Sequence, residues 1–259
     1  MQTGSRHSVP RARRTLIVVL TISFLATLGV ASAATLGLRP DTLLAVDSNQ
    51  RPPTLPPTTT TTIPPTTTTT APTAIGCDTF TTGGPTGNNL DERPQQCGNG
   101  LWNADSGEWT IVGNGRVRTR HDDATATIEV GSAFVTVQAT VEHSNGANRA
   151  GGVSLSHNGS RREHLAAVIV GPGTLQIRLV RNTNYTVLAS AAITPNVSQV
   201  VRFTRIGNNL TVRLNGTIVL TYTLTAAQAS QATGTRAGLY QEEGTALRYS
   251  NFFVTAPVP

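Results

Sequence analysis

Residues 199–224, QVVRFTRIGNNLTVRLNGTIVLTYTL, decide the fold of this chain. Aliphatic and polar residues alternate from Leu210 to Leu214, and this period of two is typical of a β-strand with one buried and one wet face. The following Asn215-Gly216 can supply the two left-handed residues of a type I′ turn, and Gly207-Asn208-Asn209 offers a second tight reversal. The stretch therefore predicts three consecutive antiparallel strands.

Similar short segments fill the chain from residue 109 onward. Turn sequences containing Gly, Asn or Pro separate them at intervals of about ten residues. No long amphipathic helix interrupts them, and the one helical turn that we expect covers residues 225–231. The pattern predicts an all-β fold, a two-sheet antiparallel sandwich. The expected strands cover residues 109–112, 116–120, 124–130, 133–142, 151–157, 163–170, 174–181, 185–191, 200–206, 210–215, 217–224, 235–241 and 246–255.

The N-terminus has the pattern of an export signal. Four arginines in the first fourteen residues precede an uncharged apolar run and an Ala-Ser-Ala site. This order is typical of a secretory signal peptide, residues 1–33, cleaved between Ala33 and Ala34. Alternatively, residues 16–38 are long enough, at about 1.5 Å rise per residue, to form an uncleaved hydrophobic helix that anchors the chain in a membrane. Both alternatives place the rest of the chain at the cell surface or outside the cell.

Residues 34–75 are predicted to form a disordered linker. Between residues 51 and 73 almost every residue is Thr or Pro. Proline lacks an amide donor and fixes φ, and threonine brings little apolar area, so this segment cannot form a core and should stay extended. The linker either acts as a stalk that holds a domain of residues 76–259 away from a membrane, or is a passive connection.

The formal net charge of +6 does not indicate a nucleic-acid partner. Residues 1–75 carry six arginines and two acidic residues, whereas residues 76–259 carry fourteen arginines and twelve acidic residues. The excess charge is therefore concentrated before the predicted domain. That domain contains no arginine-rich run interleaved with aromatic residues, which argues against a phosphate-binding surface.

Cys77 and Cys97 are the only cysteines. An even number of cysteines in an exported protein predicts a disulfide bond. The bond would close a loop of about twenty residues rich in Gly, Asn and Pro, and would contribute about 3 kcal/mol on the chain-entropy model. A zinc site is not expected, because two cysteines lack the further ligands that zinc needs.

Several short motifs follow one another along residues 76–256. They are Asp78-Thr79-Phe80, Ala104-Asp105-Ser106-Gly107 followed by Trp109, Gly151-Gly152-Val153, the Asn215-Gly216 hairpin, Gly234-Thr235-Arg236-Ala237-Gly238-Leu239 and Asn251-Phe252-Phe253-Val254. Their order and spacing resemble those of the laminin G-like, concanavalin A-like jelly-roll domains of bacterial surface and phage tail proteins. The resemblance implies two curved antiparallel sheets whose first and last strands are adjacent, with residues 78–80 beside residues 251–254. It also implies a lectin, an adhesion module or a glycoside hydrolase, since the superfamily contains all of these.

The acidic residues do not predict a catalytic pair. A retaining glycosidase needs two carboxylates about 5–5.5 Å apart, and on a strand such residues share a face only at even spacing. The enzymes of this superfamily carry an E-x-D-x-x-E type of motif, which is absent from the sequence. The adjacent pairs Asp122-Asp123 and Glu242-Glu243 are expected at turns as solvated acids. No catalytic residue is therefore assigned.

Binding residues are expected near the start of the domain. Trp102 stands in a mostly polar stretch and is a candidate for stacking on a sugar ring, with Asn103 and Asp105 beside it. Asp91, Glu92 and Asp105 are candidate calcium ligands in loops at the rim of the sandwich, although the D-x-D-x-D spacing of a calcium loop is missing. Calcium is the one cofactor that the sequence leaves open.

The histidines are not expected to form a metal site. In a meander of the three predicted strands between residues 133 and 170, His143 and His157 lie at opposite ends, roughly 25 Å apart, and cannot share an ion. His164 is expected to be an exposed residue of the same meander.

The sequence thus predicts an exported, surface-displayed binding module without catalysis, whose partner is a glycan or a protein of the cell envelope. If the N-terminal segment is uncleaved, the membrane is a further partner. Two alternatives stay open: a glycoside hydrolase of the concanavalin A-like superfamily, and a purely structural envelope protein.

Overall fold

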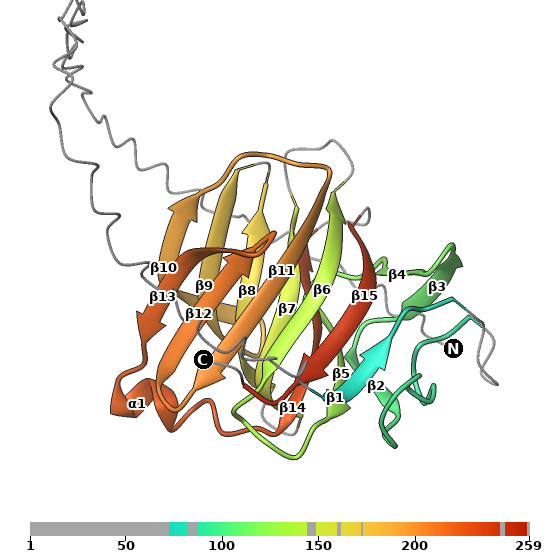
Figure 1. Ribbon diagram of the computed structural model, residues 1–259, viewed down its shortest axis with the longest axis horizontal. Coiled ribbons are helices and arrows are strands. Elements are labelled where there is room, and N and C mark those ends of the chain that lie inside the picture. Colours follow the sequence, from blue (N-terminus) through green and yellow to red (C-terminus); the bar gives the residue numbers. More distant parts are fainter. Residues whose placement is uncertain are drawn as a thin grey trace, which may run out of the picture. The chain divides into compact units, whose positions relative to one another are not determined.

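The computed structural model describes residues 73–81, 88–143, 149–159, 162–171, 173–243 and 247–257. These residues form two antiparallel β-sheets packed face to face (Figure 1). The predicted all-β, two-sheet sandwich is confirmed. The predicted export segment with its Ala33–Ala34 cleavage site lies outside the described residues, and so does the predicted Thr/Pro linker up to residue 72. The last two residues of that linker, Ala74 and Ile75, belong to strand β1, Ala74–Asp78. Within the described ranges, no helix combines the length and the apolar character needed to cross a membrane.

The first sheet contains eight strands. Seven of them follow the order β13-β12-β11-β6-β15-β4-β3, and β1 pairs with β15 beside this path. Their bounds are β1 Ala74–Asp78, β3 Trp109–Gly113, β4 Arg116–Thr119, β6 Thr136–His143, β11 Ser198–Ile206, β12 Asn209–Leu214, β13 Thr217–Thr223 and β15 Leu247–Thr255.

The second sheet contains seven strands in the order β10-β9-β8-β7-β14-β5-β2. Their bounds are β2 Trp102–Ser106, β5 Ala124–Glu129, β7 Ala150–Asn158, β8 Glu163–Val170, β9 Thr174–Arg181, β10 Asn184–Ala192 and β14 Arg236–Glu243. The predicted meander of β6, β7 and β8 is wrong. Only β7 and β8 pair with each other, because β6 lies in the other sheet between β11 and β15, two strands that come much later in the chain.

The three strands predicted from residues 199–224 are confirmed as β11, β12 and β13, which pair in series. Asn215 and Gly216 have φ angles of 50° and 88°, so both occupy the left-handed region that the type I′ turn requires. The predicted helical turn is α1, Ala226–Ala229, where Thr225 and Gln228 form a capping box.

The core lies between the two sheets. Alternate residues of each strand point into it, as the period of two predicts. The eight-stranded sheet contributes Val137, Val201, Phe203, Leu210 and Val212, and the seven-stranded sheet contributes Leu155, Leu165, Ile177 and Leu239. Each such side chain contributes about 1.5–3 kcal/mol when fully buried, so this shared interior is the main source of stability.

The first and last strands close the domain, as the resemblance implies. Asp78 of β1 lies opposite Phe252 of β15, and Cys77 lies opposite Phe253. The predicted disulfide bond between Cys77 and Cys97 is present, with Cα atoms 5.1 Å apart. Strand β2 was not expected from the sequence, and β1 was implied only by the resemblance, since both are short and only part of each is apolar.

Candidate functional site

Polar side chains line a pocket of about 240 Å³ on the face of the seven-stranded sheet that points away from the core. They come from the ends of β2 and β7, the start of β8, strands β5 and β14, and the turns before β5 and between β9 and β10. We call this site the polar pocket. Its lining residues are Ser106, Asp122, Asp123, Thr125, His157, Arg162, His164, Asn182, Thr183 and Tyr240.

Buried aromatic side chains form the deep part of the polar pocket. His157 and His164 are 1% and 2% exposed, and their ring centroids are 4.9 Å apart. Tyr240 meets the edge of His164 with centroids 5.0 Å apart, and Thr125 pairs with Tyr240 across β5 and β14. The pocket therefore has an aromatic floor that carries ring nitrogens and a phenol group.

A β-bulge places His157 in the polar pocket. Ser156 has a φ of 55°, and the pairing of β7 with β8 shifts between Leu155 and Asn158. The Ser156 hydroxyl donates to the carbonyl of Ala133 and accepts a hydrogen bond from Arg205 at 2.7 Å, so Ser156 points away from the pocket. The extra residue turns His157 to the face opposite Leu155, which lies in the core.

His157 is uncharged at neutral pH. Burial lowers its pKa from 6.5 to about 4, and the carboxylate of Asp105, 3.7 Å from its Nδ1, only partly opposes this effect. The guanidinium groups of Arg236 and Arg162 lower the pKa further. Neither ring nitrogen of His157 has a hydrogen-bond partner among the residues that the structure describes.

The other two floor groups are also uncharged. Burial, followed by the proximity of His157, holds the pKa of His164 well below 6.5, against the effect of a hydrogen bond with the Arg162 backbone. Burial and the negative charge of Glu242 raise the pKa of the Tyr240 phenol. A neutral imidazole has one donor and one acceptor nitrogen, and a phenol both donates and accepts. The floor therefore carries no formal charge at neutral pH.

Turns hold the rim of the polar pocket in place. Ser106 Oγ donates to the carbonyl of Asp123 at 2.8 Å and accepts the amide of Thr125 at 3.0 Å. The amide of Asn182 donates to the carbonyl of Arg162 at 3.1 Å, which joins two rim turns. Asp123, Arg162 and Asn182 all have left-handed backbone conformations. Asparagine and aspartate tolerate this region better than most residues, which explains their presence at two of these turns.

The sequence did not predict this site. His164 was expected to be exposed, and that expectation is wrong: it is buried and pairs across the sheet with Val180. Asp122 and Asp123 do lie at a turn as predicted, but they also line the pocket, whereas Glu242 lies within β14 and not at a turn. The only sequence signal was the presence of two histidines, His157 and His164, on either side of one predicted turn.

Trp102 does not lie on the surface. It is 1% exposed, its ring packs between Phe80 and Phe252 at centroid distances of 5.7 and 4.8 Å, and its indole N–H donates to Asp78. Asn103, the next residue of β2, is exposed. Trp102 and Asn103 therefore point in opposite directions and do not form a common surface.

Asp105 is held within the protein. One carboxylate oxygen accepts a hydrogen bond from Arg236 at 2.6 Å, and the other accepts a short hydrogen bond from Thr127. The carboxylate lies beside His157, at the edge of the polar pocket.

The candidate calcium ligands do not converge. Asp91 Oδ1 accepts the backbone amide of Ala104 at 2.9 Å, and Glu92 is exposed at a left-handed turn. The carboxylate of Asp105 is paired as described above. Among the described residues, no group of three or more His, Cys, Asp or Glu side chains is placed to hold a metal ion.

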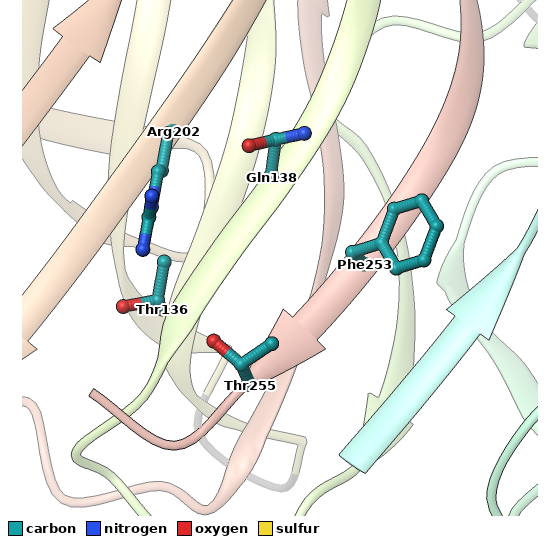
Figure 2. A pocket seen from close by; sticks show the side chains of 5 residues that line it. All are labelled: Thr136, Gln138, Arg202, Phe253 and Thr255. Carbon is teal, nitrogen blue, oxygen red and sulfur yellow. The ribbon is translucent and has the colours of Figure 1, made fainter. Parts of the chain in front are cut away.

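A second, shallower hollow lies on the outer face of the eight-stranded sheet (Figure 2). It has a volume of about 170 Å³ and is formed by side chains of β6, β11 and β15. We call it the sheet-face hollow. Its lining residues are Thr136, Gln138, Arg202, Phe253 and Thr255.

No family model matches the sequence, and no curated protein matches it. The structure is similar to the carbohydrate binding module CBM66 from Bacillus subtilis, at 14% identity and a TM-score of 0.42, covering 60% of this chain and 90% of that one.

It is also similar to a Bacillus subtilis protein of unknown function with a galectin-like fold, at 12% identity and a TM-score of 0.44, covering 61% of this chain and 90% of that one. A GH43 protein from Bacillus licheniformis matches at 13% identity and a TM-score of 0.44, over 57% of this chain and 34% of its own. Similarities of this size do not say what the present chain binds, and its function has to be inferred from its own side chains.

Proposed function

We propose that this chain is a non-catalytic carbohydrate-binding module of the laminin G-like, concanavalin A-like type, exported and displayed at the cell surface, and that its polar pocket binds a sugar. The observation that carries the proposal is the uncharged, buried floor of His157, His164 and Tyr240 beneath a polar rim. Sugar hydroxyls donate and accept hydrogen bonds at once, and neutral imidazole and phenol groups match them in both directions.

The size and rim of the polar pocket support a small sugar unit. A volume of about 240 Å³ lies below the range of about 300–1,000 Å³ that is usual for drug-sized ligands, so we expect one or two sugar rings rather than a long chain to be enclosed. Exposed Asn182 and Thr183 supply an amide and a hydroxyl at the rim, where they can complete the recognition.

A glycoside hydrolase is the second candidate, because Asp122 and Asp123 line the same pocket. Retaining hydrolysis needs two carboxylates on opposite sides of the scissile bond, about 5–5.5 Å apart. The two aspartates are consecutive residues of one turn, which does not favour this division of roles. Binding without turnover is therefore the preferred function.

The test is a glycan array of neutral mono- and oligosaccharides, followed by titration of the best ligand with the full chain. The variant Asn182→Gly removes the side-chain amide but keeps the left-handed backbone conformation of the turn, which glycine adopts readily. We expect it to weaken binding at least tenfold with an unchanged unfolding midpoint. The matched control Arg248→Gln alters an exposed residue of the other sheet and should bind like the wild type.

A reducing-sugar assay separates the two candidates. Binding without product release supports the module. Product release that disappears in Asp123→Asn would instead establish a hydrolase. A normal affinity of Asn182→Gly for the best ligand would place that ligand outside the polar pocket.

A further inference from the structure

Five threonines form a row across the outer face of the eight-stranded sheet. They lie directly opposite one another on successive strands, in the order Thr221, Thr211, Thr204, Thr136 and Thr255. Neighbouring strands are about 4.7–4.9 Å apart, so the row extends for roughly 19 Å. The residues next to them along each strand, such as Val137 and Val212, lie in the core, which directs the threonines outward.

A second row runs parallel to the threonine row, two residues away along each strand except β13, where a bulge makes the step three residues. It consists of Ile218, Arg213, Arg202, Gln138 and Phe253, again in cross-strand register. Three of its members lie in or beside the sheet-face hollow, where Figure 2 shows Arg202 and Phe253 on opposite sides of Gln138. Phe253 is 38% exposed and offers the face of an aromatic ring to solvent.

Arg202 and Arg213 place two positive charges directly opposite each other across β11 and β12. Like charges at such positions destabilise a sheet. Among the described residues, no carboxylate forms an ion pair with either guanidinium. Glu142, on the same face of β6, is held at 2.8 Å by Arg116. The arginine pair is therefore a concentration of uncompensated positive charge.

The remaining groups around the arginine pair indicate a carbohydrate. Thr136 and Thr204 are buried and share a hydrogen bond of 2.9 Å between their hydroxyls. The hydroxyl of Thr255 is buried too, without a hydrogen-bond partner in the described part of the chain, so Thr211 and Thr221 offer the accessible hydroxyls of the row. Hydroxyls, an amide and an exposed aromatic ring are the groups that contact sugar hydroxyls and the apolar faces of sugar rings. A nucleic-acid surface would show more basic residues and more aromatic stacking positions than this face carries.

We propose that this face of the eight-stranded sheet is a second binding site, independent of the polar pocket, for an extended acidic polysaccharide whose sugar rings bear carboxylates. The chain lies across the strands along the threonine row. A carboxylate binds between Arg202 and Arg213, because guanidinium groups donate two parallel hydrogen bonds to a carboxylate. One sugar ring packs against Phe253 in the sheet-face hollow.

The test is calorimetric titration of the full chain with a polygalacturonate oligomer and with the same oligomer methyl-esterified, which removes the charge but keeps the sugar. We expect the acidic oligomer to bind at least tenfold more tightly, and its affinity to fall as salt is raised from 50 to 500 mM. Arg202→Gln and Arg213→Gln should each lower the affinity at least tenfold. Thr211→Val, which removes one hydroxyl from the row without changing charge or shape, should lower it several-fold.

Two control variants show whether the arginine pair itself binds the acidic oligomer. Arg248→Gln removes one positive charge from the outer face of the eight-stranded sheet, away from the arginine pair. Asn182→Gly alters only the polar pocket. Both variants should bind the acidic oligomer normally. Equal binding of the esterified oligomer, or normal binding by Arg202→Gln and Arg213→Gln, would refute the proposal. Binding confined to single-stranded DNA or to phosphatidylglycerol vesicles would assign the face to a different anion. Loss of binding in Asn182→Gly would assign the acidic chain to the polar pocket.

Discussion

Asp78 carries a carboxylate into the interior, where it is 0% exposed. It accepts hydrogen bonds from the backbone of Phe80 at 2.7 Å, from Arg93 Nε at 3.2 Å and from the Trp102 indole at 3.0 Å. A buried charge is tolerated only with such partners, and removal of one member of a buried pair leaves the other uncompensated. Asp78 thereby joins β1, β2 and the loop between them.

The variant Asp78→Ala should lower the free energy of unfolding by about 3–5 kcal/mol, because it leaves the guanidinium of Arg93 buried without its ion pair. Urea denaturation monitored by circular dichroism measures the change. Glu108→Ala, at a side chain that is 76% exposed, is the control and should shift stability by less than about 0.5 kcal/mol. A loss below about 1 kcal/mol in Asp78→Ala would contradict the assigned role.

His157 should make stability depend on pH. Its pKa is about 4 in the folded protein and 6.5 in the unfolded chain, so the unfolded chain takes up a proton first as the pH falls. The stabilisation is complete above pH 6.5 and is lost as the pH falls towards 4. Buried His164 acts in the same direction. We expect the free energy of unfolding to be about 2–3 kcal/mol lower at pH 4.5 than at pH 7 on account of His157.

Urea denaturation at the two pH values, with His157→Gln as the matched variant, measures this effect. Glutamine does not titrate, so the variant should lose less stability between pH 7 and pH 4.5 than the wild type does. Identical losses in the two proteins would show that His157 is not the group responsible.

The direction in which a side chain points could be predicted only where the chain alternates regularly. The core positions of Leu210 and Val212 follow from the period of two, whereas the bulge at Ser156 interrupts that period and moves His157 to the opposite face. The polar residues after Trp102 suggested that it is exposed, but on a strand with one wet face the next residue, Asn103, points outward and the tryptophan points inward. A single sequence does not reveal where such a bulge lies.

The hairpin of β12 and β13 depends on the backbone conformation of one glycine. Gly216 has a φ of 88°, and a Cβ atom added there would meet no atom within 4 Å, so the only cost of a side chain is conformational. Gly216→Ala should therefore lower the free energy of unfolding by about 1–2 kcal/mol. Gly173→Ala is the control, because its added Cβ would make ordinary contact with Ile193 and its φ lies outside the left-handed region. Equal effects of the two variants in urea denaturation would contradict the explanation.

The disulfide bond should stabilise the domain by about 3 kcal/mol, the value that the chain-entropy model gives for a loop of this length. The sequence separation of Cys77 and Cys97 is 20 residues. The double variant Cys77→Ser, Cys97→Ser should show this loss in urea denaturation, and the wild type with its bond reduced should behave like the variant. If oxidised and reduced protein unfold at the same urea concentration, the bond does not constrain the unfolded chain.

The strands from residue 109 onward could be predicted because each has alternating residues and a turn at its end. Strand β1 was implied only by the resemblance and not by its own residues, because it is short and owes its place to pairing with β15 and to the disulfide at Cys77, both of which depend on distant parts of the chain. Pairing partners were predictable only within hairpins such as β11–β12–β13. Nothing local in β6 indicates that its neighbours are β11 and β15.

The two sheets share one interior, so they should unfold together. Trp102 belongs to the seven-stranded sheet and Trp109 to the eight-stranded sheet, and both are buried in the same core. Tryptophan fluorescence and far-ultraviolet circular dichroism should therefore report coincident transitions in urea. A fluorescence change that precedes the loss of β-structure would show that the end of the sandwich around the tryptophans opens on its own.

The pairing of β1 with β15 also determines how the domain responds to mechanical tension. Ala74 lies opposite Thr255, so the strand entering the domain and the strand leaving it meet in antiparallel register at the same end. A pull on the chain before Ala74 loads the hydrogen bonds of β1 one after another, as in unzipping, which requires little force. The covalent link from Cys77 to Cys97 stops this peeling after residues 74–76, and from there the load passes into the body of the sandwich.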